Sequence, residues 1–478
     1  MATDAQVEAG DEPGEALAAD GATVEAGDLP VDGPPMPDPE TVPPPPAEPV
    51  APAGRLASVD VLRGVALLGI LAMNIVDFAW PNRVYSNPYA APGAGPVDVG
   101  FWMFNHFVFD TKMMTLFSML FGAGLVLMTD RAEGRGARLG RVYYRRVSWL
   151  LVIGLIHSYL IWAGDILVMY ASCGFLLYPC RRWSPKTLLV VGTCLVLMAA
   201  PLVVGARGAF SYMKRTHERV QAETKAGKTP TKWEKRVSDG WAKTLKGTKP
   251  SHERFQKDIA THRGGYAGIV KERAEELISS QTFGFIFAGW WLAGGRMLLG
   301  MGLMKLGVFS GLRSNRFYTW MMVLGYGIGL PLMAIETAVS LRTGFFAGRP
   351  LDYITQGWVL LYLVGSMPVV LGHVGLVMLI VRAGLLSGLT RRLAAVGRMA
   401  LSNYLFDSIL CTTLFYGYGL GLYGSVPRPY LMGLTLMIWA FQLTFSPVWL
   451  AHFRYGPAEW LWRSLTYWKP QPMRAVAG

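Results

Sequence analysis

The chain has 478 residues, of which 52% are hydrophobic and only 16% are charged. Soluble domains carry about 25% charged residues, so this composition excludes an ordinary soluble enzyme. Apolar runs of about 20 residues recur along the chain, and each is long enough to span a bilayer. The runs do not alternate between polar and apolar residues as barrel strands would. The sequence therefore predicts an all-α, polytopic integral membrane helical bundle.

Charge is unevenly distributed along the chain. Residues 1–54 contain twelve Asp or Glu and no Lys or Arg, and they are rich in proline. A segment of this composition cannot bury enough apolar surface to fold, so we expect a disordered cytoplasmic tail. The net charge of +13 therefore arises from the remaining residues. We assign it to loops that flank membrane helices, and we expect no nucleic-acid partner.

About ten membrane spans follow the tail. They are expected near residues 57–80, 100–128, 145–163, 165–181, 187–206, 281–308, 317–340, 354–382, 393–423 and 429–451. The second and the ninth are long enough to tilt or break. The predicted organisation is an N-terminal membrane bundle (55–206), a helical insert (207–280), a C-terminal membrane bundle (281–470) and a short tail (471–478).

Arginine and lysine in the short loops predict the orientation. Basic residues concentrate in the loops 129–146, 181–186, 309–316 and 383–392, and such loops face the cytoplasm. Both termini are then cytoplasmic. The insert carries 17 Lys or Arg and nine Asp or Glu, yet alternation places it outside, which is acceptable because long loops translocate largely regardless of charge. We expect a small extracytoplasmic helical insert, either lying on the membrane surface or forming a solvated cap.

Ionisable residues inside membrane spans are costly and by default indicate function. In the first span Asp60 and Arg63 are three residues apart and can pair, whereas Asn74 and Asp77 lie on the outer half. In the second span the candidates for a substrate or proton path are His106, Asp110 and Lys112. His106 and Asp110 share a helix face, and Lys112 points elsewhere, toward the side of Thr115.

The stretch HSYLIWAGDIL contains His157, Trp162 and Asp165. It reads as the outer end of the third span, a turn, and the start of the fourth. Asp165 fits a helix N-cap. His157 is either a general base or proton relay, or a packing histidine that is hydrogen-bonded to a neighbouring helix.

Later spans add Arg296, Asn403 and Asp407 to the candidate path. We interpret Arg296 and Asp407 as mutual partners near mid-membrane, and His373 as a packing histidine. The four cysteines form no CxxC pair, so no metal site is predicted.

Several motifs occur in an order that closely resembles the YeiB-like bacterial membrane proteins, domain of unknown function 418. They are SVDVLRGVALLGILAMNI, KMMTLFSMLFGAG, LIHSYLIWAGDILVMYASCG, QTFGFIFAGWWLAGGRMLLGMGLMKLGVFSG, GRMALSNYLFDSIL and RYGPAEWLWRSLTYWK. The resemblance covers about residues 55–470, and residues 281–470 resemble the YeiB-like C-terminal domain. It implies a multi-pass protein of the bacterial inner membrane.

The first span is also similar to that of transmembrane acyltransferases, which include sugar O-acyltransferases and the heparan-α-glucosaminide N-acetyltransferase type. In the O-acyltransferase branch an arginine is followed eleven residues later by a proposed catalytic histidine. Arg63 matches the arginine, but Asn74 stands at the histidine position. His157 is the residue that the resemblance offers in its place.

Three functions compete at this point. An acyltransferase would move an acyl group from cytoplasmic acyl-CoA, a co-substrate and not a bound cofactor, to a small-molecule, lipid or glycan acceptor at the outer face. His157 would be its base or would carry the acyl group covalently. Asp165 or Asp77 would orient His157, and Arg63 would either meet the donor phosphates or pair with Asp60. A secondary transporter would use the intramembrane charges. A scaffold or sensor would use the tail and insert. The one partner common to all three is the lipid bilayer.

Overall fold

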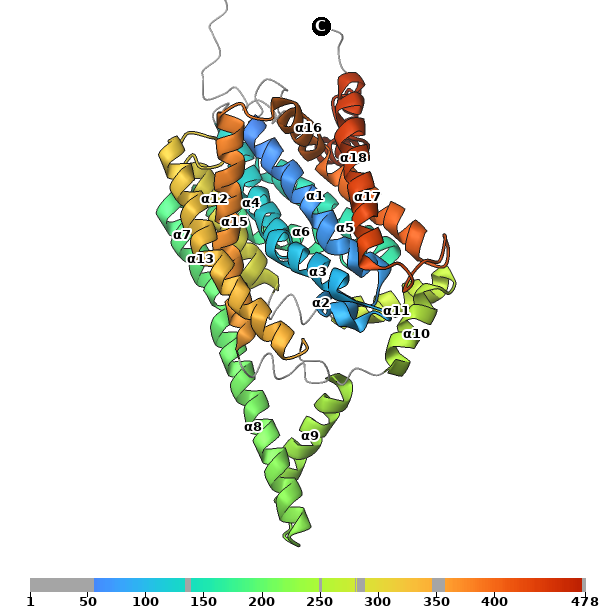
Figure 1. Ribbon diagram of the computed structural model, residues 1–478. Coiled ribbons are helices and arrows are strands. Elements are labelled where there is room, and N and C mark those ends of the chain that lie inside the picture. The colour runs from blue at the N-terminus through green and yellow to red at the C-terminus, as the bar shows by residue number, and fades with distance from the viewer. Residues whose placement is uncertain are drawn as a thin grey trace, which may run out of the picture. The chain divides into compact units, whose positions relative to one another are not determined.

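The computed structural model describes residues 56–133, 139–248, 252–279, 281, 289–345 and 357–474. Within these residues every named secondary-structure element is a helix. An isolated β-bridge joins Phe453 and Arg474. The predicted all-α membrane bundle is confirmed (Figure 1). The predicted tail of residues 1–54 lies outside the described residues.

The helices follow one another in the order that Figure 1 shows by colour. The first half contains α1 (Ala57–Ala79), α2 (Asn82–Ser86), η2 (Pro88–Ala90), α3 (Pro96–Val108), α4 (Lys112–Glu133), α5 (Gly140–Ile156), η3 (His157–Ile161), α6 (Leu167–Leu177), η4 (Pro179–Arg182), α7 (Pro185–Leu197) and α8 (Ala199–Lys225). The second half contains α9 (Lys232–Thr248), α10 (His252–His262), α11 (Tyr266–Ser279), α12 (Gly295–Lys305), α13 (Asn315–Arg342), α15 (Trp358–Arg382), α16 (Ser387–Arg398), α17 (Ala400–Phe415), α18 (Arg428–His452) and α19 (Pro457–Tyr467).

Six helical stretches in the described residues are long and apolar enough to cross a membrane. They are Ala57–Ala79, Pro96–Asp130, Pro185–Lys225, Asn315–Arg342, Val364–Arg382 and Arg428–His452. Each coincides with one of the ten predicted spans. The other predicted spans correspond to shorter or interrupted helices, namely α5 with η3, α6, α12, and α16 with α17.

Helix α1 lies at the centre of the bundle, in contact with α4, α16, α17 and α18 (Figure 1). Most of its residues are buried. Its contact with α16 depends on two glycines: a Cβ added to Gly64 would lie 2.0 Å from the carbonyl oxygen of Leu393, and one added to Gly397 would lie 2.0 Å from that of Asp60. Because no side chain fits there, the backbones of α1 and α16 touch, and the polar end of α1 is held in place.

The two predicted spans whose length suggested a break are both interrupted, and the fifth span is also interrupted, at Met198 between α7 and α8. The second span is interrupted at residues 109–111, between α3 and α4, where Thr111 adopts a φ of 58°. The ninth is interrupted at Met399, between α16 and α17. Irregular backbone at membrane depth is tolerated only where protein or a polar cavity surrounds it. Asp110 lies in the first break and Lys112 begins the helix that follows it, so the break positions polar side chains inside the bundle.

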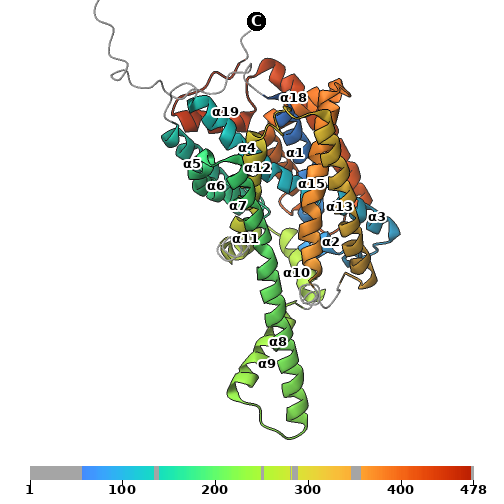
Figure 2. The ribbon, with the colours of Figure 1, turned by 90° about the vertical axis from the view of Figure 1, so that its left-hand side faces the viewer.

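The predicted insert is helical. Helix α8 continues the membrane helix α7 almost directly and pairs with α9, as Figure 2 shows. Helices α10 and α11 return to the bundle. The carbonyl of His262 accepts a hydrogen bond from Gly417 N at 2.8 Å, and Arg263 Nε donates to the carbonyl of Tyr423 at 2.6 Å. The second half of the insert therefore packs directly on the loop after α17.

Candidate functional site

His157 and Asp165 form a buried dyad at the end of α5. Nδ1 of His157 lies 2.7 Å from Oδ2 of Asp165, and each side chain is only 1% exposed. His157 opens η3, a single wide π-turn. The second carboxylate oxygen of Asp165 accepts from Val168 N at 2.8 Å, as predicted for a cap at the start of α6. Asp165 thus fixes both the histidine and the following helix.

The other ring nitrogen of His157 is available. In the part of the chain that the structure describes, no group hydrogen-bonds to Nε2 although it is buried. The ring of Tyr404 on α17 lies 5.1 Å from the imidazole, centroid to centroid, and the Tyr404 hydroxyl accepts from Ile166 N at 3.3 Å. Trp162 lies nearby in sequence and stacks on Phe78 at 4.0 Å. The dyad is therefore held by α1 and α17 as well as by its own helix pair.

Helix α11 of the insert covers this region. The hydroxyl of Tyr266 donates to the carbonyl of Leu160 at 2.8 Å, and Arg273 Nη1 donates to the carbonyl of Tyr159 at 3.3 Å. Both acceptors belong to the π-turn that begins at His157. The insert is thereby attached to the element that carries the histidine.

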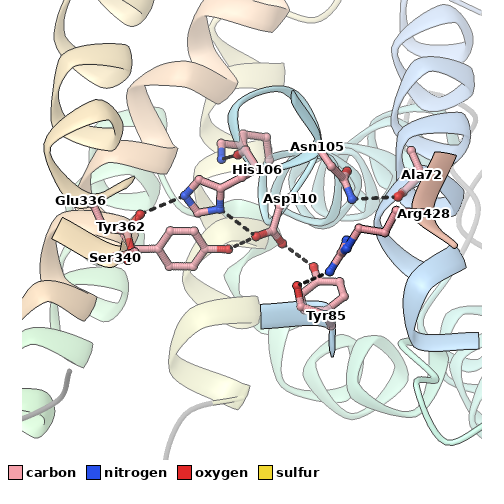
Figure 3. A network of polar contacts seen from close by, with 10 residues as sticks. Ala72, Tyr85, Asn105, His106, Asp110, Glu336, Ser340, Tyr362 and Arg428 are labelled. Atoms are coloured by element: carbon pink, nitrogen blue, oxygen red, sulfur yellow. Dashed lines mark hydrogen bonds and ion pairs between the residues drawn. The ribbon is translucent and has the colours of Figure 1, made fainter. Parts of the chain in front are cut away.

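A second polar cluster surrounds His106 (Figure 3). Its Nε2 lies 2.9 Å from Oε2 of Glu336 on α13, and its Nδ1 lies 3.4 Å from Oδ2 of Asp110. Asp110 also accepts from the hydroxyl of Tyr362 on α15 at 2.6 Å and from the hydroxyl of Tyr85. Four helical elements thus converge on one histidine and two carboxylates.

Lys112 closes this cluster from the break between α3 and α4. Its side chain is fully buried, its amine donates to the carbonyl of His106, and it lies 5.8 Å from the centroid of the Tyr362 ring. The charges of Asp110 and Glu336 act on it. From helical spacing we expected Lys112 to point away from His106 and Asp110. It instead contacts the His106 carbonyl, because the backbone leaves the helical conformation at Thr111.

The remaining predicted residues lie apart from these two clusters. Arg63 and Asp60 form the expected ion pair at 2.8 Å. Asp77 accepts from Asn82 at 3.2 Å, and Asn74 is partly buried on the same helix. The amide of Asn403 donates to Ser446 at 3.2 Å, and Tyr326 and the Val108 carbonyl lie within hydrogen-bond distance of the two nitrogens of His373, which supports packing roles.

Asp407 has a different partner from the one we inferred. Its carboxylate accepts from Gln442 on α18 at 2.6 Å, and no ion pair joins it to Arg296 within the described ranges. Sequence reasoning also missed the partners Glu336, Tyr85, Tyr362 and Tyr404 as site residues. In the sequence these residues are recognisable only as polar or hydroxyl-bearing side chains within or beside apolar helices. That pattern does not show which histidine or carboxylate each one contacts. No group of His, Cys, Asp and Glu in the described residues is arranged to hold a metal ion.

Comparison with known proteins places this architecture in a family. Residues 303–469 match the family described as "Protein of unknown function (DUF418)". Over 427 residues the chain is 32% identical to "Uncharacterized protein YxaH" of Bacillus subtilis (strain 168), covering 88% of this chain and 96% of that protein. Over 425 residues it is 31% identical to "Uncharacterized protein YeiB" of Escherichia coli (strain K12), covering 86% and 96%. No solved structure matches the chain significantly. The chain belongs to the DUF418 family of YeiB- and YxaH-like proteins.

Proposed function

We propose that the chain is a membrane-embedded acyltransferase whose general base is His157. The observation that carries the proposal is a buried histidine with one nitrogen on a carboxylate and the other without a partner among the described residues. A buried polar atom normally has a hydrogen-bond partner. An unpaired nitrogen on an otherwise fixed ring is suited to receive a proton from an acceptor substrate.

Asp165 sets the state of the ring. An ionised carboxylate only accepts hydrogen bonds, so its 2.7 Å contact places the proton on Nδ1 and leaves a lone pair on Nε2. The same carboxylate is anchored by Val168 N, which limits rotation of the pair. Asp165 is a positioning residue, and it also stabilises the imidazolium that forms during the reaction.

The reaction balances with a thioester donor. Nε2 of His157 removes the proton of an acceptor hydroxyl or amine, and the acceptor atom attacks the thioester carbonyl carbon. The carbon–sulfur bond breaks, and the departing thiolate receives the proton from the imidazolium. The products are the acylated acceptor and free coenzyme A, and the histidine is restored without any further reactant.

An arginine group supports acyl-CoA as the donor. Arg63 on α1 and Arg463 on α19 both act electrostatically on Arg146 at the start of α5. Arg146 lies 3.8 Å from the ring of Trp462. Asp60 compensates part of this charge by pairing with Arg63, and the remaining positive charge favours a polyanion. The Arg-rich loops predict that this end faces the cytoplasm, where acyl-CoA is made, and the proposed membrane is the bacterial inner membrane.

The test measures transfer by the purified full-length chain in lipid nanodiscs. Acetyl-CoA is supplied with glycan, lipid and amine acceptors, and released thiol and acylated product are measured together. Wild type should form product, and His157→Gln should not. His373→Gln is the matched control, because both nitrogens of that partly buried histidine have hydrogen-bond partners. Equal product formation by wild type and His157→Gln contradicts the proposal.

A second candidate, transport of a small solute or ion, is favoured by the His106 cluster. Buried charges beside an interrupted helix are typical of substrate sites in transporters. Proton or solute flux into proteoliposomes should then be lost in Asp110→Asn and retained in His157→Gln. Acyl transfer that is lost in His157→Gln and retained in Asp110→Asn favours the acyltransferase. The same pair of variants therefore separates the two functions.

A further inference from the structure

Arg296 is fixed inside the bundle near the start of α12. Arg296 is only 6% exposed to solvent. A Cβ added to Gly300 would lie 1.9 Å from the carbonyl oxygen of Met119, and one added to Gly122 would lie 2.0 Å from that of Met297. Helices α12 and α4 therefore touch backbone to backbone at two points within the four residues after Arg296, and this contact fixes the rotation of α12.

The guanidinium group lies far from either end of the bundle. Lys305 ends α12, where its amine donates to the carbonyls of Arg181 and Trp183. Nine residues of helix separate the two side chains, which corresponds to about 14 Å. The hydrocarbon core is about 30 Å thick, so a group about 14 Å from one end of α12 lies near its middle.

Arg296 has no anionic partner in the part of the chain that the structure describes. Its Nε is buried without a hydrogen bond, and the carboxylate we expected beside it, Asp407, accepts from Gln442. The titratable groups that act on it are the phenols of Tyr170 and Tyr362. Neither phenol carries a negative charge near neutral pH.

The other buried cations have hydrogen-bond acceptors, whereas Arg296 has none in the described structure. Four Lys or Arg residues are buried in the described ranges, and three of them donate to backbone carbonyls: Lys112 to His106, Arg273 to Tyr159, and Arg428 to Val84. Arg296 is the exception. Each of the other buried cations has at least one hydrogen-bond acceptor in the described structure, so the missing partner of Arg296 requires a separate explanation.

We propose that Arg296 is an anion-binding site in the membrane interior, and that it takes the carboxylate or phosphate group of a ligand. Arginine does not lose its proton in proteins, and a buried charge without a counter-charge is strongly unfavourable. A planar guanidinium matches an oxyanion with two parallel hydrogen bonds. The site is independent of the chemistry proposed at His157, because none of its groups belongs to the dyad.

The test is calorimetric titration of the full-length protein in detergent, with sodium acetate and sodium phosphate as separate probes. Wild type should bind one or both saturably, and Arg296→Met should bind at least about tenfold more weakly, as expected for a lost charge-assisted pair. Arg296→Lys should retain part of the affinity. Saturation by acetate alone assigns a carboxylate ligand, and saturation by phosphate alone assigns a phosphate.

Thermal unfolding separates binding from a structural role. In buffer without either probe, Arg296→Met should unfold no earlier than wild type, because it removes an uncompensated charge. Arg428→Met is the matched control and should unfold earlier while still binding the probe, since it loses hydrogen bonds to the Val84 and Tyr85 carbonyls. The proposal is overturned if neither probe binds wild type saturably, if Arg296→Met binds as tightly, or if it unfolds as early as Arg428→Met. Loss of acyl transfer with intact anion binding would affect only the function proposed for His157.

Discussion

Two buried histidines of this protein differ in how their nitrogens are used. His157 is 1% exposed and has one carboxylate partner, Asp165, with its second nitrogen unpaired in the described structure. His106 is 5% exposed and lies between two carboxylates, Asp110 and Glu336. Burial is almost the same at both sites, so the number of acceptors around the ring decides what each histidine can do.

The difference has a direct chemical meaning. Two ionised carboxylates can both accept from an imidazole only when both ring nitrogens carry protons, so the surroundings of His106 favour a charged ring with no lone pair to offer. A single carboxylate engages only one ring nitrogen, as at His157, and the other nitrogen has no hydrogen-bond partner in the described structure. The first arrangement suits a fixed charge or a proton store, and the second suits a base.

The largest expected effect concerns Nε2 of His157, which has no hydrogen-bond partner in the described structure. His157→Gln should lower the rate of acyl transfer about 10²- to 10⁴-fold, the range for loss of a general base. Stability should change little, because the glutamine amide can still donate to Asp165 and Nε2 has no partner to lose in the described structure. Product formation and thermal unfolding of the same sample measure both. A variant that unfolds early, and transfers normally once corrected for its folded fraction, would assign His157 a packing role.

The second-largest effect concerns His106, whose two ring nitrogens both face carboxylates. His106→Leu leaves Asp110 and Glu336 without their shared partner, and removing one member of a buried charged set costs about 3–5 kcal/mol. Denaturant unfolding should show this loss. The double variant His106→Leu with Glu336→Leu should recover part of it, because fewer uncompensated charges remain. If the double variant is as unstable as the sum of the single variants, the two residues do not act as a pair.

A smaller effect is expected when His157 loses its one carboxylate partner. Asp165→Asn removes the carboxylate that keeps the proton on Nδ1 of His157, so transfer should fall by less than the loss of the base itself, about 10- to 100-fold. Asp110→Asn should leave the rate of transfer unchanged, because Asp110 belongs to the other cluster. An unchanged rate in Asp165→Asn would remove Asp165 from the positioning role.

The smallest effect is a pH dependence outside the membrane. Burial opposes protonation of His262, but the hydrogen bond and charge of Asp258 outweigh it and raise the pKa of His262 above 6.5. The stabilisation is then complete below the unfolded pKa and is lost as pH rises through the folded value. Amide hydrogen exchange in α10 should therefore be slower at about pH 6 than at about pH 8 after correction for intrinsic rates, and His262→Gln should remove the difference. Greater protection at the higher pH would reverse the assigned sign.

Local relations could be predicted from the sequence, and distant ones could not. The pairs Asp60–Arg63 and His106–Asp110 follow from helical spacing, and both are present. The cap at Asp165 follows from its place before α6. By contrast, Glu336 is 230 residues from His106, and Gln442 takes the position beside Asp407 that we assigned to Arg296. One sequence gives the depth of a membrane residue but not the rotation and neighbours of its helix, which are set by packing.

The attachment of α11 to the π-turn has a consequence for biogenesis. The carbonyls of Tyr159 and Leu160 accept from Arg273 and Tyr266, which follow them by 114 and 106 residues. His157 and Asp165 are therefore synthesised and inserted long before the segment that covers them. Domains form in the order of synthesis, so the ribosome-bound intermediate holds a dyad with its outer end still open. A nascent chain arrested before α10 would carry the same histidine and aspartate in a site that water can enter.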